Sequence, residues 1–206
     1  MSDCSSGFWD MRCKYGFEHR TRLMQEYLYP YIHPELKKCA KQFGDVSKET
    51  LVIHLRGHDV NTYTKDFHPC HAQPACSMYD DVIQRSKIPY KRIIIASDGS
   101  HPCVDTITKK FNNTGRTVAL SSRGDMFYDA CALLGAKNVV WGRSGFSAMF
   151  MMLNPDRDQV YLPFAPTIVL TCDSIPTHSA KFSEYHYMPG GLKKSVELSD
   201  NFSKLQ

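Results

Sequence analysis

The stretch HLRGHD, residues 54–59, holds the side chains with the clearest chemical potential in this 206-residue sequence. It follows the apolar run LVI and supplies two imidazoles, a guanidinium and a carboxylate. The planar guanidinium of Arg56 suits a diphosphate, because it offers paired donors to phosphate oxygens and keeps its charge. The alternative is structural: Arg56 and Asp59 would form a surface ion pair, with His54 a hydrogen-bonded core residue.

A second polar group, ASDGS at 96–100, follows the apolar run RIII. Ser97 and Asp98 would stand just before a helix, where free backbone N–H groups and a partial positive charge favour a phosphate or a ribose. The same residues also fit an ordinary helix N-cap in a tight turn, and taken alone the pattern favours the cap.

A third group, GRSGFS at 142–147, joins one apolar run to another. Small and hydroxyl residues at such a junction present backbone N–H groups to a phosphate, and Arg143 adds charge. The candidate ligand-binding residues are Arg143, Ser144, Gly145, Phe146 and Ser147. The stretch is neither a Walker loop nor a GxGxxG fingerprint, and it misses the GxSxG elbow of serine hydrolases by one position.

The eight cysteines contain no CxxC pair, so the sequence carries neither a zinc ribbon nor a thioredoxin motif. Some of them, such as Cys131 in an apolar run, fit buried free thiols. The segment HPCHAQPAC, residues 68–76, leaves three possibilities open: a zinc site, a disulfide between Cys70 and Cys76, or an ordinary loop. The zinc ligands would be His68, Cys70, His71 and Cys76.

Short apolar runs alternate with longer amphipathic stretches from Thr50 onward. We expect strands at 50–56, 92–97, 116–120, 138–142 and 159–163, and helices at 77–87, 101–112, 125–135 and 145–153. This alternation predicts an α/β fold, a Rossmann-like and mostly parallel sheet with helices on both faces. Ligands of such sheets bind beyond the carboxyl ends of the strands, where the three polar groups would lie.

We expect three parts along the chain. Residues 1–48 would be a helical lead-in packed on the main domain, with helices in EHRTRLMQEYLY and PELKKCAKQF. Residues 49–190 would form the Rossmann-like domain, in which FAPTIVLTC, residues 164–172, fits one more strand. Residues 191–206 would be a tail.

The net charge of +4 comes without a block of like charges, so no nucleic-acid partner is indicated. No apolar run is long enough to span a membrane. Sequons start at Asn112 and Asn201 and matter only in a secretory lumen. The compartment stays open: cytoplasmic if the cysteines are free, secretory if the sequons are used.

The order of these motifs resembles the fucosyltransferase superfamily of α-1,2, α-1,6 and protein O-fucosyltransferases. Its first motif, His-x-Arg with a nearby Asp at a strand end, looks like HLRGHD; the family's strand ending in Ser/Thr-Asp looks like IIIASD. Its Asp followed by a Ser-rich turn and an apolar helix looks like Asp129 with SGFS. The aromatic SSGFWDMRCKYGF, residues 5–17, is similar to a stretch ahead of the first motif. The resemblance covers residues 5–163.

The resemblance implies the nucleotide-sugar-binding half of a GT-B glycosyltransferase that needs no metal or other cofactor. Arg56 would hold the donor's β-phosphate, and His54 and Asp129 would lie near the nucleoside. Ser144, Gly145 and Phe146 would meet the phosphates, and Asp98 would line the same pocket. The further candidate binding residues are His58, Ser97, Arg143 and Ser147.

Two departures qualify what the resemblance implies. Gly57 stands where many members carry a second Arg, so the donor is GDP-fucose or another nucleotide-deoxyhexose such as UDP-rhamnose. Most of the acceptor-binding half is absent from the sequence. The catalytic base would be Asp59, with His58 and Asp66 as alternatives.

The first hypothesis is therefore an inverting, metal-independent glycosyltransferase that moves a deoxyhexose to a glycan or protein hydroxyl. The second is a non-catalytic nucleotide- or sugar-binding module of a larger protein. A third is a redox or metal protein built on the Cys/His segment. Partners would be the nucleotide-sugar donor, a glycan or glycoprotein acceptor and further domains of a longer chain.

Overall fold

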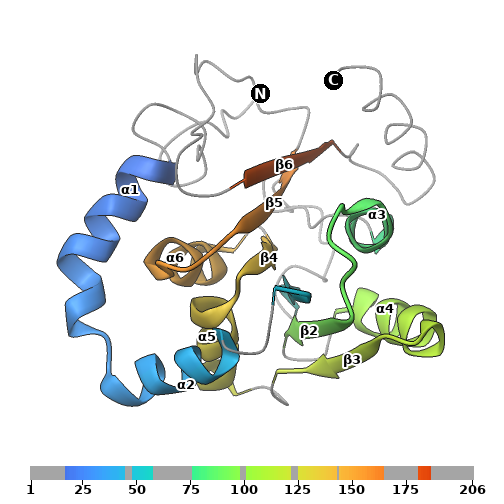
Figure 1. The fold of residues 1–206 in the computed structure, drawn as a ribbon, viewed down its shortest axis with the longest axis horizontal. Helices are drawn as coiled ribbons and strands as arrows, with labels where there is room; N and C mark the ends of the chain where they lie inside the picture. The colour runs from blue at the N-terminus through green and yellow to red at the C-terminus, as the bar shows by residue number, and fades with distance from the viewer. Residues whose placement is uncertain are drawn as a thin grey trace, which may run out of the picture.

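The computed structural model describes residues 17–44, 48–57, 76–97, 101–121, 125–142, 144–164 and 181–186. Six strands in these ranges form one sheet in the order β3-β2-β1-β4-β5-β6, and every neighbouring pair is parallel (Figure 1). Their bounds are β1 Thr50–His54, β2 Arg92–Ala96, β3 Thr117–Leu120, β4 Asn138–Val140, β5 Gln159–Phe164 and β6 Lys181–His186. A doubly wound Rossmann sheet has this order.

Four helices connect the first five strands. They are α3 (Cys76–Arg85), α4 (Cys103–Phe111), α5 (Met126–Gly135) and α6 (Gly145–Leu153), each in the crossover that follows β1, β2, β3 and β4 in turn. A short 3-10 turn, η6 (Asn112–Thr114), separates α4 from β3. In Figure 1 α3 and α4 lie on one side of the sheet and α5 and α6 on the other. The expectation of helices on both faces is confirmed.

The inner strands β1, β2 and β4 are largely apolar and buried because helices cover both faces of the sheet there. Successive side chains of a strand point to opposite faces. Val52 of β1 belongs to the cluster formed with α5 and α6, whereas Leu51 and Ile53 belong to the cluster formed with α3 and α4. Because side chains alternate between the two faces, the continuous apolar run of β1 contributes to both hydrophobic cores.

The helices before the sheet pack on its α5–α6 side. They are α1 (Phe17–Leu23), the π-helix η2 (Met24–Leu28), the 3-10 turn η3 (Tyr29–Tyr31) and α2 (Pro34–Gly44). Gln25 donates to the carbonyl oxygens of Met152 (3.2 Å) and Asn154 (3.1 Å) at the end of α6. Helix α2 approaches α5 so closely that a Cβ at Gly135 would collide with the backbone of Ala40. Among the described residues, no helix is long and apolar enough to cross a membrane.

The expected strands and the four crossover helices are confirmed, with differences only at their ends. Strand β6 is an element that the sequence did not predict; it pairs with β5 along its whole length. The strand expected within FAPTIVLTC lies almost entirely outside the described residues. The domain boundaries at 49 and 190 stay a prediction.

The cysteine expectations are wrong on two points. Cys131 is not a free thiol but is bonded to Cys39, and this disulfide joins α5 to α2. Cys76 is bonded to Cys103, joining α3 to α4, and so does not pair with Cys70. Every cysteine among the described residues is in a disulfide. The spacing of cysteines could not show either pairing, because each partner is brought close by the order of the helices around the sheet.

The two disulfides differ in the length of chain they close, 92 residues for Cys39–Cys131 and 27 for Cys76–Cys103. A cross-link stabilises a fold by restricting the unfolded chain, and the longer loop loses more entropy. We expect Cys39→Ala with Cys131→Ala to lower the free energy of unfolding by about 2–5 kcal/mol. Cys76→Ala with Cys103→Ala should cost about 1 kcal/mol less. Urea titration followed by circular dichroism would measure both, and the reverse ranking would contradict this account.

Candidate functional site

The order of the strands singles out one place at the carboxyl edge of the sheet. From β1 the chain proceeds to β2 on one side, and it returns to β4 on the other side of β1. The crossovers after β1 and β4 therefore leave toward opposite faces, and in sheets of this kind the ligand-binding crevice is expected between the ends of these two strands. His54 ends β1, and Ile53 of β1 is in register with Val140, the last residue of β4.

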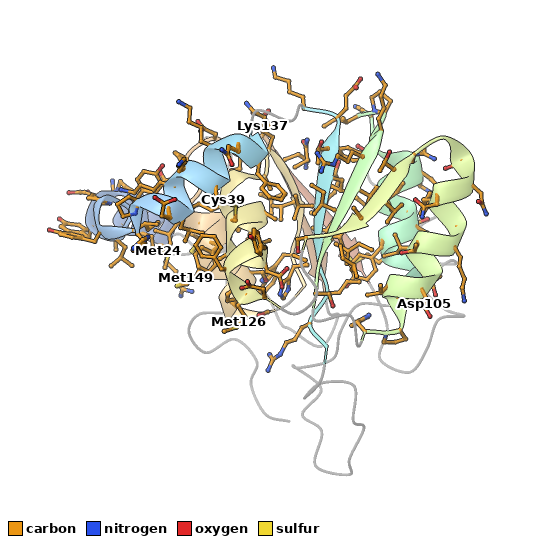
Figure 2. The ribbon with its side chains drawn as sticks, turned by 90° about the horizontal axis from the view of Figure 1, so that it is seen from below. Met24, Cys39, Asp105, Met126, Lys137 and Met149 are labelled. Carbon is orange, nitrogen blue, oxygen red and sulfur yellow. A yellow bond between two sulfur atoms is a disulfide. The ribbon has the colours of Figure 1, made fainter. Side chains whose placement is uncertain are left out.

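Figure 2 shows the two edges of the sheet. Met126 and Asp105, near the starts of α5 and α4, lie at the edge opposite to Lys137, which precedes β4. The starts of the helices and the carboxyl ends of the strands thus share one edge. The candidate residues within the described ranges follow strands or begin helices, so they belong to this edge.

His54 and Phe146 belong to separate motifs that lie 92 residues apart in the sequence, yet their rings are neighbours in the fold. Their ring centroids are 6.0 Å apart, with an angle of 35° between the planes. His54 is 6% exposed. Gly142, just after β4, allows this approach, because a Cβ there would fall on the carbonyl oxygen of His54 and within 2.6 Å of its Nδ1. The HxR and SGFS motifs are therefore brought together.

Arg56 lies on the same side of the chain as His54. Leu55 still packs with Leu51 and Ile53 on the α3–α4 side, and its N–H donates to the carbonyl of Ala96 at 3.0 Å. The alternation of β1 thus continues past its last residue, which assigns Arg56 to the side that faces α6. Arg56 is partly exposed, whereas the neighbouring Gly57 is buried.

The start of α6 is a further part of this edge, because the helix begins at Gly145 soon after β4 ends. Ser144 is the N-cap residue, yet its hydroxyl makes no capping hydrogen bond. Its carbonyl is held in place by Trp141 Nε1 (3.0 Å), Ser147 Oγ (3.1 Å) and the N–H of Ala148 (3.0 Å). No atom of the described residues lies within 4 Å of a Cβ placed on Gly145. This helix start combines fixed N–H groups with open space, which suits an anion.

The ends of β2 and β3 supply further polar groups. Ser97, 2% exposed, directly follows β2. Asp129, 7% exposed, sits in the first turn of α5 and accepts a short hydrogen bond from Ser121, which follows β3. The helix start at α5 is capped by Asp125, whose carboxylate accepts from the N–H of Phe127 at 2.8 Å. Asp129 is therefore not needed as a cap.

Sequence reasoning missed two polar residues at this edge. His101 is 4% exposed, and its Nδ1 accepts from the N–H of Cys103 at 3.1 Å. That bond makes Nδ1 the acceptor and leaves Nε2 as the protonated nitrogen of a neutral ring. Ser121 holds Asp129. Ser121 directly follows β3, which was a usable signal, whereas His101 stands five residues past β2 and shortly before α4; neither belongs to a recognisable motif.

Five candidate residues lie outside the described ranges: His58, Asp59, Asp66, Asp98 and Arg143. The same holds for the expected zinc ligands other than Cys76, whose sulfur is in a disulfide with Cys103 and is thus no thiolate ligand. Among the residues that the structure describes, no three His, Cys, Asp or Glu side chains gather as a metal site.

These features define an α/β protein with a Rossmann-type parallel sheet and buried polar residues at the carboxyl ends of its strands. No protein-family model and no curated protein sequence matches the chain. Among solved structures it is similar to POFUT1 bound to GDP-fucose, with a TM-score of 0.46 and 13% identity over 72% of this chain and 46% of that chain. For POFUT1 bound to GDP the TM-score is 0.46 and the identity 15%, over 72% of this chain and 47% of that chain.

Apo POFUT1 gives a TM-score of 0.44 and 17% identity over 58% of this chain and 42% of that chain. The chain thus spans just under half the length of these proteins. The likeness is too distant to bear on activity.

The contact between Gly142 and His54 gives a test of the crevice. Gly142→Ala would push a methyl group into the backbone of His54, and overpacking of this kind costs about 1–3 kcal/mol of unfolding free energy. Gly145→Ala is the matched control, because its methyl group would meet no described atom. We expect the control to stay within about 0.5 kcal/mol of the parent in urea unfolding. Equal stability of the two variants would rule out the close approach.

Proposed function

We propose that the chain is the donor-binding part of a glycosyltransferase, which transfers a deoxyhexose from a nucleotide diphosphate sugar to a hydroxyl of a glycan or protein. Fucose is the preferred sugar and rhamnose the next. The observation that carries the proposal is the meeting of His54 with the start of α6 at the switch point, on the side assigned to Arg56. The two motifs of the fucosyltransferase resemblance converge at that place.

The crevice offers a diphosphate two kinds of positive potential. Arg56 brings a permanent charge and paired donors, and the start of α6 brings backbone N–H groups with the positive end of the helix dipole. A leaving diphosphate gains negative charge in the transition state, and donors fixed in advance stabilise it without reorganisation. This explains why glycosyl transfer at this site would need no metal ion.

In the proposed reaction the acceptor oxygen attacks the anomeric carbon of the sugar on the face opposite the diphosphate. The bond from that carbon to the β-phosphate oxygen breaks, and the diphosphate leaves with the electron pair. A base removes the acceptor proton; Asp59 is our choice, with His58 and Asp66 as alternatives. The sugar is transferred with inversion.

The remaining proposed contacts concern the nucleoside and phosphates. His54 and Asp129 would lie near the nucleoside, and both are buried, so any hydrogen bond they make to a base would be shielded from water. Ser97, Asp98 and His58 would line the same pocket. Arg143, Ser144, Gly145, Phe146 and Ser147 would surround the phosphates at the start of α6.

Nucleotide binding to the folded chain tests the proposal directly. We expect titration calorimetry to detect GDP and GDP-fucose, or else UDP and UDP-rhamnose, with affinities that a chelator does not change. Arg56→Ala should weaken diphosphate binding by about 2 kcal/mol, about 30-fold, because a charge-assisted phosphate contact is lost.

Arg85→Ala is the matched control for that loss of charge. Arg85 pairs with Asp81 one turn away on α3, where its side chain is 48% exposed, so we expect unchanged affinity. If none of the four nucleotides binds at millimolar concentration, the proposal fails. Unchanged affinity in a folded Arg56→Ala variant would remove Arg56 from the site.

Replacement of the base separates catalysis from binding. Asp59→Asn keeps the size of the side chain but cannot accept the acceptor proton as a carboxylate does. We expect donor binding to persist while transfer or donor hydrolysis falls by about 10²–10⁴-fold. Tight donor binding with no turnover in the parent chain itself would instead favour a non-catalytic binding module. Full activity of Asp59→Asn would transfer the role to His58 or Asp66.

A further inference from the structure

The turn between α4 and β3 carries the sequon Asn112-Asn113-Thr114, which the proposed function does not use. All three residues are exposed, and Gly115, with φ of 75°, turns the chain toward β3. Thr114 Oγ1 donates to the carbonyl of Phe111 at 2.8 Å and accepts from Arg116 Nη1 at 3.0 Å. The sequon is therefore displayed on an ordered surface turn.

Among the described strands β3 is an edge of the sheet, and Asn112 covers part of that edge. The N–H groups of Thr117 and Ser121 donate to carbonyls of the β2 segment, so by alternation the N–H of Val118 points away from the sheet. Asn112 Oδ1 accepts from this N–H at 2.9 Å. The side-chain nitrogen Nδ2 makes no hydrogen bond to the described residues, so it can be modified without loss of the edge contact.

The two disulfides supply an independent observation. Bonds between Cys39 and Cys131 and between Cys76 and Cys103 persist in oxidising compartments, such as the secretory lumen, and are rare in the cytosol. Sequons are used in that same compartment. The sequence left the cellular compartment open, and the disulfides and the sequon both favour a secretory compartment.

We propose that Asn112 is an N-glycosylation site, and that its glycan shields the open edge of the sheet along β3. In this modification Nδ2 loses a proton and forms a bond to the anomeric carbon of an oligosaccharide. The bond from that carbon to its lipid-linked diphosphate carrier breaks. Unpaired edge strands template aggregation, and a bulky polar group beside one prevents a second chain from pairing with it.

The position of Asn112 keeps the glycan away from the candidate site. Asn112 precedes β3, whose first residue, Thr117, is in register with Arg92 at the start of β2. The crevice lies at the other end of the strands, where His54 is in register with Ala96. A strand length therefore separates the two, at about 3.3 Å per residue. Glycosylation and donor binding are compatible.

The experiment is secretion of the full chain from a eukaryotic cell behind an appended signal peptide, followed by peptide mass mapping with and without peptide-N-glycosidase. We expect an oligosaccharide on Asn112 in the parent and in Thr114→Ser, which keeps both the sequon and the hydroxyl. Asn112→Asp is the matched variant without a glycan, because its carboxylate oxygen still accepts from the N–H of Val118. Thr114→Ala should also lose the glycan at 112.

Recovery of unmodified Asn112 in the folded, secreted parent would overturn the proposal, whatever happens at Asn201. The shielding role has its own readout, the monomer fraction by light scattering at rising concentration. We expect the glycosylated parent and Thr114→Ser to remain monomeric at concentrations at which Asn112→Asp self-associates. Equal monomer fractions for folded Asn112→Asp and the parent would overturn the shielding.

Discussion

The handedness of the crossover connections is the constraint on which the rest of this structure depends. Parallel strands joined through helices connect almost always in the right-handed sense. With β1 in the interior and the chain proceeding first to β2 and later to β4 on the opposite side, α3 and α4 must cover one face and α5 and α6 the other. The helices that follow β1 and β4 therefore lie on opposite faces, and the ends of these two strands are the expected ligand-binding place of such a sheet.

Packing around His54 then sets the distance between the ends of β1 and β4. Gly142 lets the segment after β4 approach the backbone of His54, and Phe146 in the first turn of α6 lies against the imidazole ring. The far end of α6 is fixed as well, because the buried guanidinium of Arg157 donates to the carbonyls of Met151 (3.2 Å) and Asn154 (2.5 Å). Anchoring at both ends holds the N–H groups of the first turn in one place. A fixed dipole is worth more to a developing charge than one that must reorient.

The sequence predicted what depends on local pattern and missed what depends on tertiary distance. Burial on both faces makes the inner strands continuous apolar runs, so β1, β2 and β4 were recognisable, and the strand-end rule put HLRGHD and SGFS at one edge. KFSEYH has neither a continuous nor an alternating apolar pattern, so β6 was missed. The disulfide partner of Cys131 is 92 residues away, and only the packing of α2 on α5 makes the two neighbours. The bond between Ser121 and Asp129 likewise follows from the strand order.

In the proposed reaction, Gly57 leaves more of the stabilisation of the leaving diphosphate to backbone N–H groups than a second Arg would. Many members of the resembling family have a second Arg at this position, whereas here a buried Gly follows Arg56. With one guanidinium fewer, the N–H groups at the start of α6 must stabilise more of the charge of the leaving diphosphate. Those groups recognise phosphate oxygens and carry no information about the base or the sugar. In the proposal, donor selectivity would then come from the buried polar residues at the strand ends, His54 and Asp129 among them, because a site built to hydrogen-bond one base rejects another that lacks the matching groups.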